Sequence, residues 1–284
     1  MAAYGDKPKR QLICLSNTFE VSPATASYCA GFELEKWRCS ALADHLMEWI
    51  ADYALREDEL DVTHGNMYVR LKEAAARVYK SDNYKRRGEI GEIALHAICR
   101  DFFDTIPIAP RVFYLTSSND VVKSFDMVHV RYVNRQNFEL WLGESKLYED
   151  SSAAISAAIE SVNSHIDQGF LNHEKLILGP QISKSIPHYK KIRDIFSIQS
   201  SLDELFKNTV FPVLVMADSP AVKNAKNHSN EYSTSVSQEL SVLKQKIESS
   251  GLHQKIKIVV IYLPLGSKNE LSAAFDKRLK GISP

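Results

Sequence analysis

Two stretches in the middle of the chain place acidic side chains where an apolar pattern would continue. Residues 124–133 and 138–147 each read as a strand, and the polar residues 134–137 between them are typical of a turn. Successive side chains of a strand point to opposite faces, so the two stretches predict an antiparallel hairpin with one apolar face. If the pairing starts next to the turn, the facing pairs are Tyr132–Phe138, Val130–Leu140, Val128–Leu142 and Asp126–Glu144.

The acidic pair Asp126 and Glu144 would be costly on a buried face. Carboxylates about 5 Å apart across a ladder repel each other, and burying them without a partner costs several kcal/mol more. A divalent cation removes both costs, because carboxylate oxygens are the ligands that Mg²⁺ prefers. Lys146 follows Glu144 by two residues and so lies on the same face. These residues predict either a Mg²⁺ site, with Mn²⁺ as a substitute, or an ion cluster at the end of a sheet.

A helix over residues 88–103 is the element expected to approach this pair. Its apolar face is formed at a spacing of about four residues by Ile90, Ala94, Ile98 and Phe102. Gly91 falls within that face and would let the backbone approach a sheet closely, at about 1 kcal/mol in helix propensity. Glu92 lies at the boundary of the face, and we expect its carboxylate to reach the acidic pair. Glu89, on the opposite side with His96 and Arg100, is the second choice for the helix carboxylate.

The remaining pattern predicts the elements that surround the hairpin. Strands are expected at residues 11–15, 111–116, 211–217 and 256–263, the last two as apolar runs covered on both faces. Helices are expected at residues 34–55, 68–79, 188–196, 235–249 and 269–279. A further helix, capped by Ser151 or Ser152, would pack its small side chains on the sheet.

Three further groups of side chains carry expectations about their surroundings. Solvent is the expected surrounding of His165 and Gln168, at the far end of the helix that begins near residue 151. The second face of the hairpin is mixed and is expected to tolerate water; it carries Phe125, Met127, His129, Arg131, Glu139 and Trp141. The basic residues 85–87 predict either a phosphate contact or a solvated turn.

The composition argues against several classes of protein. Zero net charge and 44% hydrophobic side chains in 284 residues suit a large α/β core and do not indicate a globally basic nucleic-acid binder. The four cysteines and nine histidines lack the spacing of a zinc site, which argues against a zinc hydrolase. With no apolar run near ~18 residues and no signal segment, we expect a cytoplasmic protein without a membrane span.

The expected order of helix, three strands, helix and a later strand resembles the restriction-endonuclease-like PD-(D/E)xK fold. In that family a helix glutamate, a strand aspartate and an acid-x-Lys motif surround one or two metal ions. The matching positions here are Glu92, Asp126, and Glu144 with Lys146, although no proline precedes Asp126. More specifically, the segments RRGEIGEIALH, KSFDMVHVRY and LWLGESKLY resemble the nuclease subunit of the Hachiman anti-phage system, the HamA family.

This resemblance implies a fold, an activity and a partner. The fold would be α/β, with a restriction-endonuclease-like core in residues 84–284 (a mixed central sheet flanked by helices) and a mainly helical N-terminal extension in residues 1–83. The activity would be Mg²⁺-dependent cleavage of DNA, restrained by a superfamily 2 helicase partner similar to HamB. The catalytic residues would be Glu92, Asp126, Glu144 and Lys146, with the three acids as metal ligands. The alternative is a non-catalytic adaptor that binds DNA or tethers the helicase, and the presence of all these residues favours the enzyme.

Overall fold

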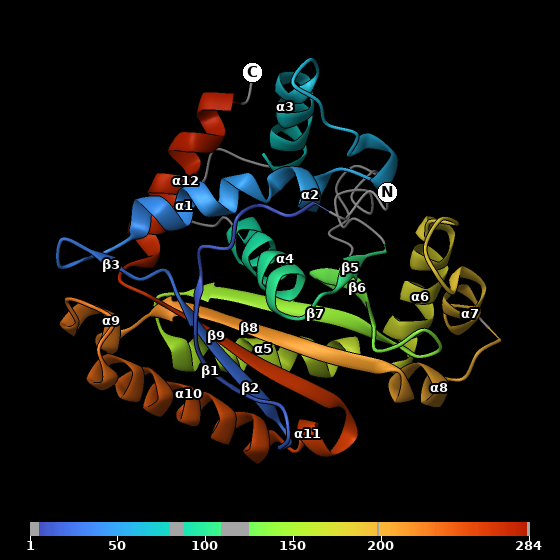
Figure 1. Cartoon of the computed structure of the whole chain (residues 1–284). Helices are drawn as coiled ribbons and strands as arrows, with labels where there is room; N and C mark the ends of the chain where they lie inside the picture. Colours follow the sequence, from blue (N-terminus) through green and yellow to red (C-terminus); the bar gives the residue numbers. More distant parts are fainter. Residues whose placement is uncertain (1–5, 80–87, 109–124, 198, 283–284) are drawn as a thin grey trace.

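A mixed β-sheet runs through the whole molecule (Figure 1). The computed structural model describes residues 6–79, 88–108, 125–197 and 199–282. Seven strands lie in the order β1-β2-β9-β8-β7-β6-β5. The neighbours β2, β9, β8 and β7 are parallel, whereas β1 and β6 pair antiparallel with β2 and β7, and β5 pairs antiparallel with β6. The strands are β1 Ile13–Thr18, β2 Ala24–Cys29, β5 Ile106–Pro107, β6 Met127–Tyr132, β7 Phe138–Tyr148, β8 Thr209–Asp218 and β9 Lys257–Leu265.

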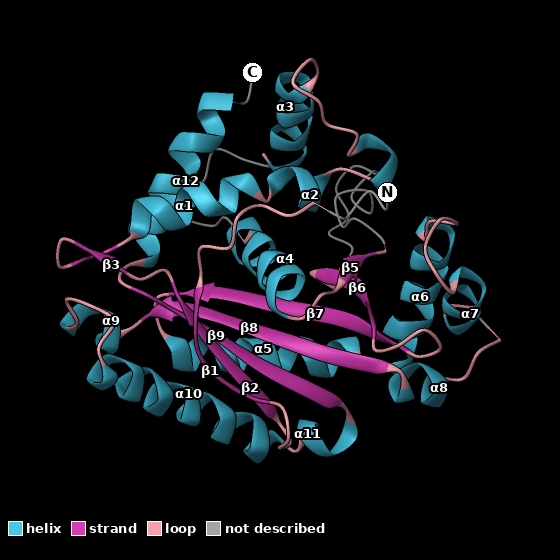
Figure 2. Cartoon of the chain, in the orientation of Figure 1, coloured by secondary structure: helices cyan, strands magenta, loops and turns pink. Residues whose placement is uncertain are grey.

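Helices cover both faces of this sheet (Figure 2). One face lies under α1 (Cys39–Glu48), α4 (Glu89–Phe102) and α12 (Lys268–Ile282), which share an apolar core with alternate residues of the strands. The other face is covered by α5 (Ser151–His165) and α10 (Asn230–Ser250). The central strands β8 and β9 are buried along nearly their whole length, because apolar side chains of both faces are covered. This arrangement confirms the α/β fold with a mixed, helix-flanked sheet that the sequence predicts.

The described residues form further helices besides these. They are α2 Ile50–Ala54, η1 Glu57–Glu59, α3 Met67–Val78, α6 Gln168–Leu178, η4 Gly179–Gln181, α7 Tyr189–Ile195, α8 Leu202–Lys207, α9 Pro220–Asn224 and α11 Leu252–Lys255. The cap of α5 is Asp150, whose side chain accepts a hydrogen bond from the Ala153 N–H over 2.6 Å, and not one of the serines that follow it. The expected strand at 111–116 and the basic residues 85–87 lie outside the described residues. Within the described parts of the chain, no helix is long and apolar enough to cross a membrane.

The N-terminal residues depart most from expectation. Instead of one helix over residues 34–55, the chain forms the hairpin β3 (Phe32–Glu33) and β4 (Lys36–Trp37) before α1 and α2 begin. The turn residues Leu34 and Glu35 have φ values of 49° and 62°, a left-handed conformation that stops a right-handed helix. In addition, β1 and β2 belong to the central sheet, where β2 pairs with β9. The central sheet therefore includes strands from both sides of the boundary expected at residue 83.

Gly143 of β7 allows α4 to pack on the strand, and its replacement should be costly. A Cβ at this position would lie 2.7 Å from Cδ2 of Leu95 and 3.1 Å from Cβ of Met127, and the second atom cannot rotate away. We expect Gly143→Ala to lower the free energy of unfolding by roughly 1–3 kcal/mol, measured by urea denaturation. Gly281→Ala is the matched control, because nothing lies within 4 Å of a Cβ there. Equal stability of the two variants would contradict this account of the contact.

Candidate active site

The hairpin predicted from the sequence is present in the expected register. The facing pairs of β6 and β7 include Tyr132–Phe138, Val130–Leu140 and Val128–Leu142. Asp126 lies one residue before β6 begins. Its backbone N–H donates to the carbonyl of Gly143 over 2.9 Å, whereas a continued ladder would place Asp126 opposite Glu144 and turn this N–H away from β7. The regular ladder therefore ends in an irregular step at the first of the predicted site residues.

This step is accompanied by two hydrogen bonds that tie the Asp126 carboxylate to Ser145. Its Oδ2 atom accepts from the Ser145 N–H over 2.8 Å and from the Ser145 hydroxyl over 2.9 Å. Asp126 is buried, with 8% of its surface exposed. Two donors on one carboxylate oxygen fix the orientation of a buried anion. The structure thus brings Asp126 against the backbone of the segment that carries Glu144 and Lys146.

Glu144 and Lys146 form an ion pair on the sheet face that α5 covers. Nζ of Lys146 donates to Oε1 of Glu144 over 2.6 Å. The Glu144 carboxylate is buried, whereas the lysine is partly exposed at 21% of its side chain. Leu142 precedes Glu144 by two residues and packs in the same core as α5, which confirms the expected face. The lysine therefore connects a buried carboxylate to solvent.

His165, at the end of α5, completes this cluster and was expected in solvent. It is buried, with Nδ1 only 3.4 Å from Oε2 of Glu144. The ring stacks on Phe170 at 4.5 Å between centroids and meets the edge of Phe125 at 5.0 Å. The expectation is wrong because α6 starts three residues later and lays Phe170 over the ring. A signal was present: the buried stripe of α5 (Ala154, Ala158 and Val162) continues to His165 at a spacing of three.

The ionisation of the pair reflects its burial. Burial is the main cause that raises the pKa of Glu144, the nearby charge of Asp126 adds to it, and Lys146 opposes both, so that the value is about 7. Burial alone would lower the pKa of Lys146, but the charge and hydrogen bond of Glu144 outweigh it and raise the pKa overall. The lysine is therefore a stable cation near neutral pH, and Glu144 is a carboxylate that its surroundings hold in the ionised form only weakly.

Glu92 lies on the other side of the same segment. Gly91 packs against Ser145, and a Cβ on this glycine would be 3.1 Å from the Ser145 Oγ atom, which confirms the close approach of helix and sheet. Ser145 is thus the common neighbour of α4 and of the Asp126 carboxylate. Glu92 is buried and accepts a hydrogen bond from the hydroxyl of Tyr53 on α2. Glu89 is buried as well, so burial alone does not separate the two glutamates.

The second face of the hairpin is buried over most of its length and is open to solvent near the turn, where Arg131 is exposed. Met127, His129 and Trp141 are all buried, because α4 packs over them. The mixed pattern that suggested water belongs to a polar network instead, since His129 bonds to His96 of α4 at 3.1 Å. Only the covering helix, which the hairpin sequence does not contain, distinguishes a polar network of this kind from a solvated face.

The chemistry of the acidic pair fits a hard divalent cation. Oε2 of Glu144 is buried without a hydrogen bond to the described residues, and the carboxylate feels the charge of Asp126. A cation between such oxygens would cancel their repulsion. In the part of the chain that the structure describes, no three His, Cys, Asp or Glu side chains form a group arranged to hold a metal. The roles of Asp126, Glu144 and Glu92 as metal ligands therefore stay a prediction.

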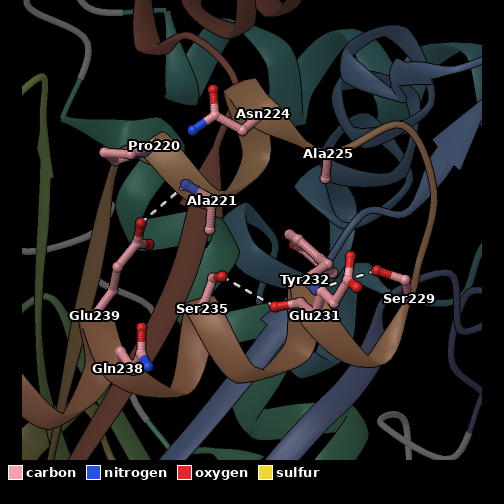
Figure 3. A pocket seen from close by; sticks show the side chains of 10 residues that line it. All are labelled: Pro220, Ala221, Asn224, Ala225, Ser229, Glu231, Tyr232, Ser235, Gln238 and Glu239. Carbon is pink, nitrogen blue, oxygen red and sulfur yellow. Dashed lines mark hydrogen bonds between the residues drawn. The ribbon is translucent and has the colours of Figure 1, made fainter.

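Two cavities of the described structure lie apart from this cluster. One, of about 420 Å³, lies between α9 and α10 and is drawn in Figure 3. Its walls include Glu239, whose carboxylate accepts from the Ala221 N–H over 3.0 Å and from the Tyr262 hydroxyl over 2.9 Å. The other, also about 420 Å³, lies near Trp141 and the β1–β2 loop. None of the predicted site residues lines either cavity. The acidic cluster is therefore a candidate site because of its buried charged side chains, and not because it lines a cavity.

Comparisons with known proteins add one family and one relative. The family model of HamA matches residues 11–279 of the chain. Among curated proteins, the chain is similar to "Anti-bacteriophage protein A" of Escherichia coli (strain K12), with 24% identity over 124 residues. That match covers 44% of this chain and 23% of the relative, so the chain matches less than a quarter of the relative's length. No solved structure matches the chain.

Proposed function

Because this chain belongs to the HamA family, we propose that it acts in defence against bacteriophages as a metal-dependent DNA nuclease. The name of the E. coli relative supports the defence role. The observation that carries the nuclease proposal is the cluster of Asp126, Glu144 and Lys146 at the irregular end of the hairpin. A buried acidic pair beside a stable cation is suited to holding a metal ion and a phosphodiester together.

The residues have separate roles in this proposal. Asp126 and Glu144 would hold Mg²⁺, or Mn²⁺ in its place, with Glu92 as a third carboxylate. The bound ion would polarise the scissile phosphate and lower the pKa of a water molecule that attacks it. Lys146 stays protonated, so it serves as a donor to the attacking water or to the charge that develops on the phosphate, and not as a base. The two hydrogen bonds from Ser145 keep the Asp126 carboxylate in its orientation while charges move.

A superfamily 2 helicase similar to HamB is the partner that we propose. This part of the proposal rests on the family resemblance. A nuclease that is restrained by such a partner would cut DNA only in its presence or only after its release. The purified chain should therefore be tested both alone and with the helicase.

The double variant Glu144→Ala/Lys146→Ala should lose DNA cleavage altogether. It removes Glu144, a predicted metal ligand, and Lys146, whose ammonium group donates to the Glu144 carboxylate. The measurement is Mg²⁺-dependent degradation of plasmid DNA by the chain, alone and with the helicase. Glu139→Ala/Lys257→Ala is a matched control: it breaks another Glu–Lys pair, of 2.5 Å, between Glu139 of β7 and Lys257 of β9, and should cleave normally.

Two results would end this proposal. Cleavage by the Glu144→Ala/Lys146→Ala variant at the normal rate would show that the cluster is not the active site. DNA binding without cleavage by the unmodified chain, with and without helicase and at saturating Mg²⁺, would assign the chain to the adaptor class.

A further inference from the structure

Three polar side chains form a stripe on α4 that faces α2. Glu92, His96 and Arg100 follow each other at intervals of four residues, so they lie along one side of the helix. All three are buried. Each of them bonds to one of two adjacent residues of α2, Asp52 or Tyr53. This stripe is a contact between a five-residue helix from the N-terminal part of the chain and the helix that carries the predicted third carboxylate.

Asp52 is the anchor of this contact. Arg100 donates to both of its carboxylate oxygens, from Nε to Oδ1 over 3.0 Å and from Nη2 to Oδ2 over 3.1 Å. Nε2 of His96 lies 2.7 Å from Oδ1. The network extends into the sheet, where Nδ1 of His96 meets Nε2 of His129 at 3.1 Å and Nδ1 of His129 meets the Thr105 hydroxyl at 2.7 Å. The position of α2 is therefore set by α4, whose His96 is itself held by His129 of β6.

A network of this kind is a poor way to gain stability alone. Desolvation of a buried ion pair offsets much or all of its Coulomb attraction, and an apolar contact of the same volume is often as stable. What directional bonds supply in addition is a defined position, because the two helices can satisfy Asp52 and Arg100 in one alignment only. The residue whose position follows from this alignment is Tyr53, next to Asp52, and its hydroxyl donates to Glu92.

We propose that Tyr53 is a positioning residue for the Glu92 carboxylate in metal binding, an inference that rests on the proposed nuclease function. The hydroxyl donates to one carboxylate oxygen, Oε2, and so limits the rotation of the side chain beside the Gly91–Ser145 contact. Residues that orient a metal ligand in this way commonly change metal affinity or activity by roughly 10–100-fold when they are removed. The N-terminal part of the chain is then a component of the active site and not an appendage to it.

Tyr53→Phe tests the proposal, because it keeps the buried ring and deletes only the hydroxyl. Mn²⁺ is titrated into the full chain, and its binding is followed by the rise in melting temperature. The Mn²⁺ concentration at half of the maximal rise should increase by roughly 10–100-fold. DNA cleavage should fall by a similar factor at low Mn²⁺ and recover towards the normal rate at saturating Mn²⁺, a pattern that a general loss of stability does not produce.

Tyr262→Phe is the matched control. It deletes the hydroxyl of another buried tyrosine that donates to a glutamate, in this case Glu239 beside the cavity of Figure 3. Its Mn²⁺ dependence should equal that of the unmodified chain. An unchanged Mn²⁺ midpoint in Tyr53→Phe, or an equal shift in both variants, would overturn the positioning role.

Failure of this inference can be told from failure of the proposed function. Glu144→Ala is titrated in the same way. If Glu144→Ala loses Mn²⁺ binding and cleavage while Tyr53→Phe keeps both, the nuclease site stands and the role of Tyr53 is wrong. If Glu144→Ala also binds Mn²⁺ and cleaves normally, the site itself is wrong and the inference about Tyr53 falls with it.

Discussion

Glu144→Gln should stabilise the metal-free protein by about 3 kcal/mol at pH 8 and abolish its DNA cleavage. Burial and the charge of Asp126 raise the pKa of Glu144 from its ordinary 4.5 to about 7. Between these values the folded state binds more protons than the unfolded state, so stability falls as the pH rises through this range. The loss is complete above pH 7, and a shift of this size corresponds to about 3 kcal/mol. Glutamine has nearly the same shape but is neutral, so Glu144→Gln removes this loss of stability.

The pH dependence of the gain identifies its origin. Urea denaturation in the presence of a chelator should show the full gain at pH 8 and under about 1 kcal/mol at pH 5, where Glu144 of the unmodified protein is protonated. Mn²⁺ should then stabilise the unmodified protein and have little effect on Glu144→Gln. A gain that is equal at both pH values, or a loss of stability at pH 8, would refute the explanation. The buried acid would then be an ordinary structural residue.

Asp52→Ala should lower the free energy of unfolding by about 3–5 kcal/mol, the typical cost of removing one partner of a buried ion pair. Burial alone would raise the pKa of Asp52, but the hydrogen bond and charge of His96 and the Arg100 guanidinium lower it overall. Asp52 is therefore ionised in the folded protein. Its removal takes a carboxylate away from a guanidinium that is only 2% exposed. Thermal and urea denaturation measure the loss.

Asp44→Ala is the control for this result. Asp44 also forms a two-pronged pair with an arginine, Arg278, at 2.5 Å and 3.0 Å, but its side chain is 59% exposed. Solvent screens such a pair, and we expect its loss to cost less than about 1 kcal/mol. Similar losses in both variants would mean that burial does not govern the strength of these pairs, contrary to the argument for the α2–α4 contact.

Much of the candidate site follows from local sequence pattern. The alternation of residues 124–133 and 138–147 and the polar turn predict the register of β6 and β7, because a slip by one residue would expose every apolar side chain of one face. The position of Gly91 within an apolar stripe predicts the close contact with the sheet. The two-residue period of a strand places Glu144 and Lys146 on one face of β7. These features depend on residues within one element or one hairpin.

Other features depend on which distant element covers a given side chain. His165 is buried because α6 returns over the end of α5, and His129 because α4 lies across the hairpin. The partner of Arg100 is Asp52, from a helix 48 residues earlier in the chain. The expected helix at residues 34–55 fails for a local reason, since two consecutive left-handed residues form a turn that helical periodicity does not reveal.

The sequence by itself determined the hairpin of β6 and β7, its register and the face on which Glu144 and Lys146 lie, since periodicity along one segment sorts side chains between its two sides. The tertiary structure alone decided that Asp126 bonds to Ser145, that His165 borders the acidic pair and that α2 holds the α4 carboxylate. The physical reason is that covering a side chain takes a second segment. The choice among segments depends on the packing of the whole sheet and its helices, to which residues of the N-terminal part contribute two strands.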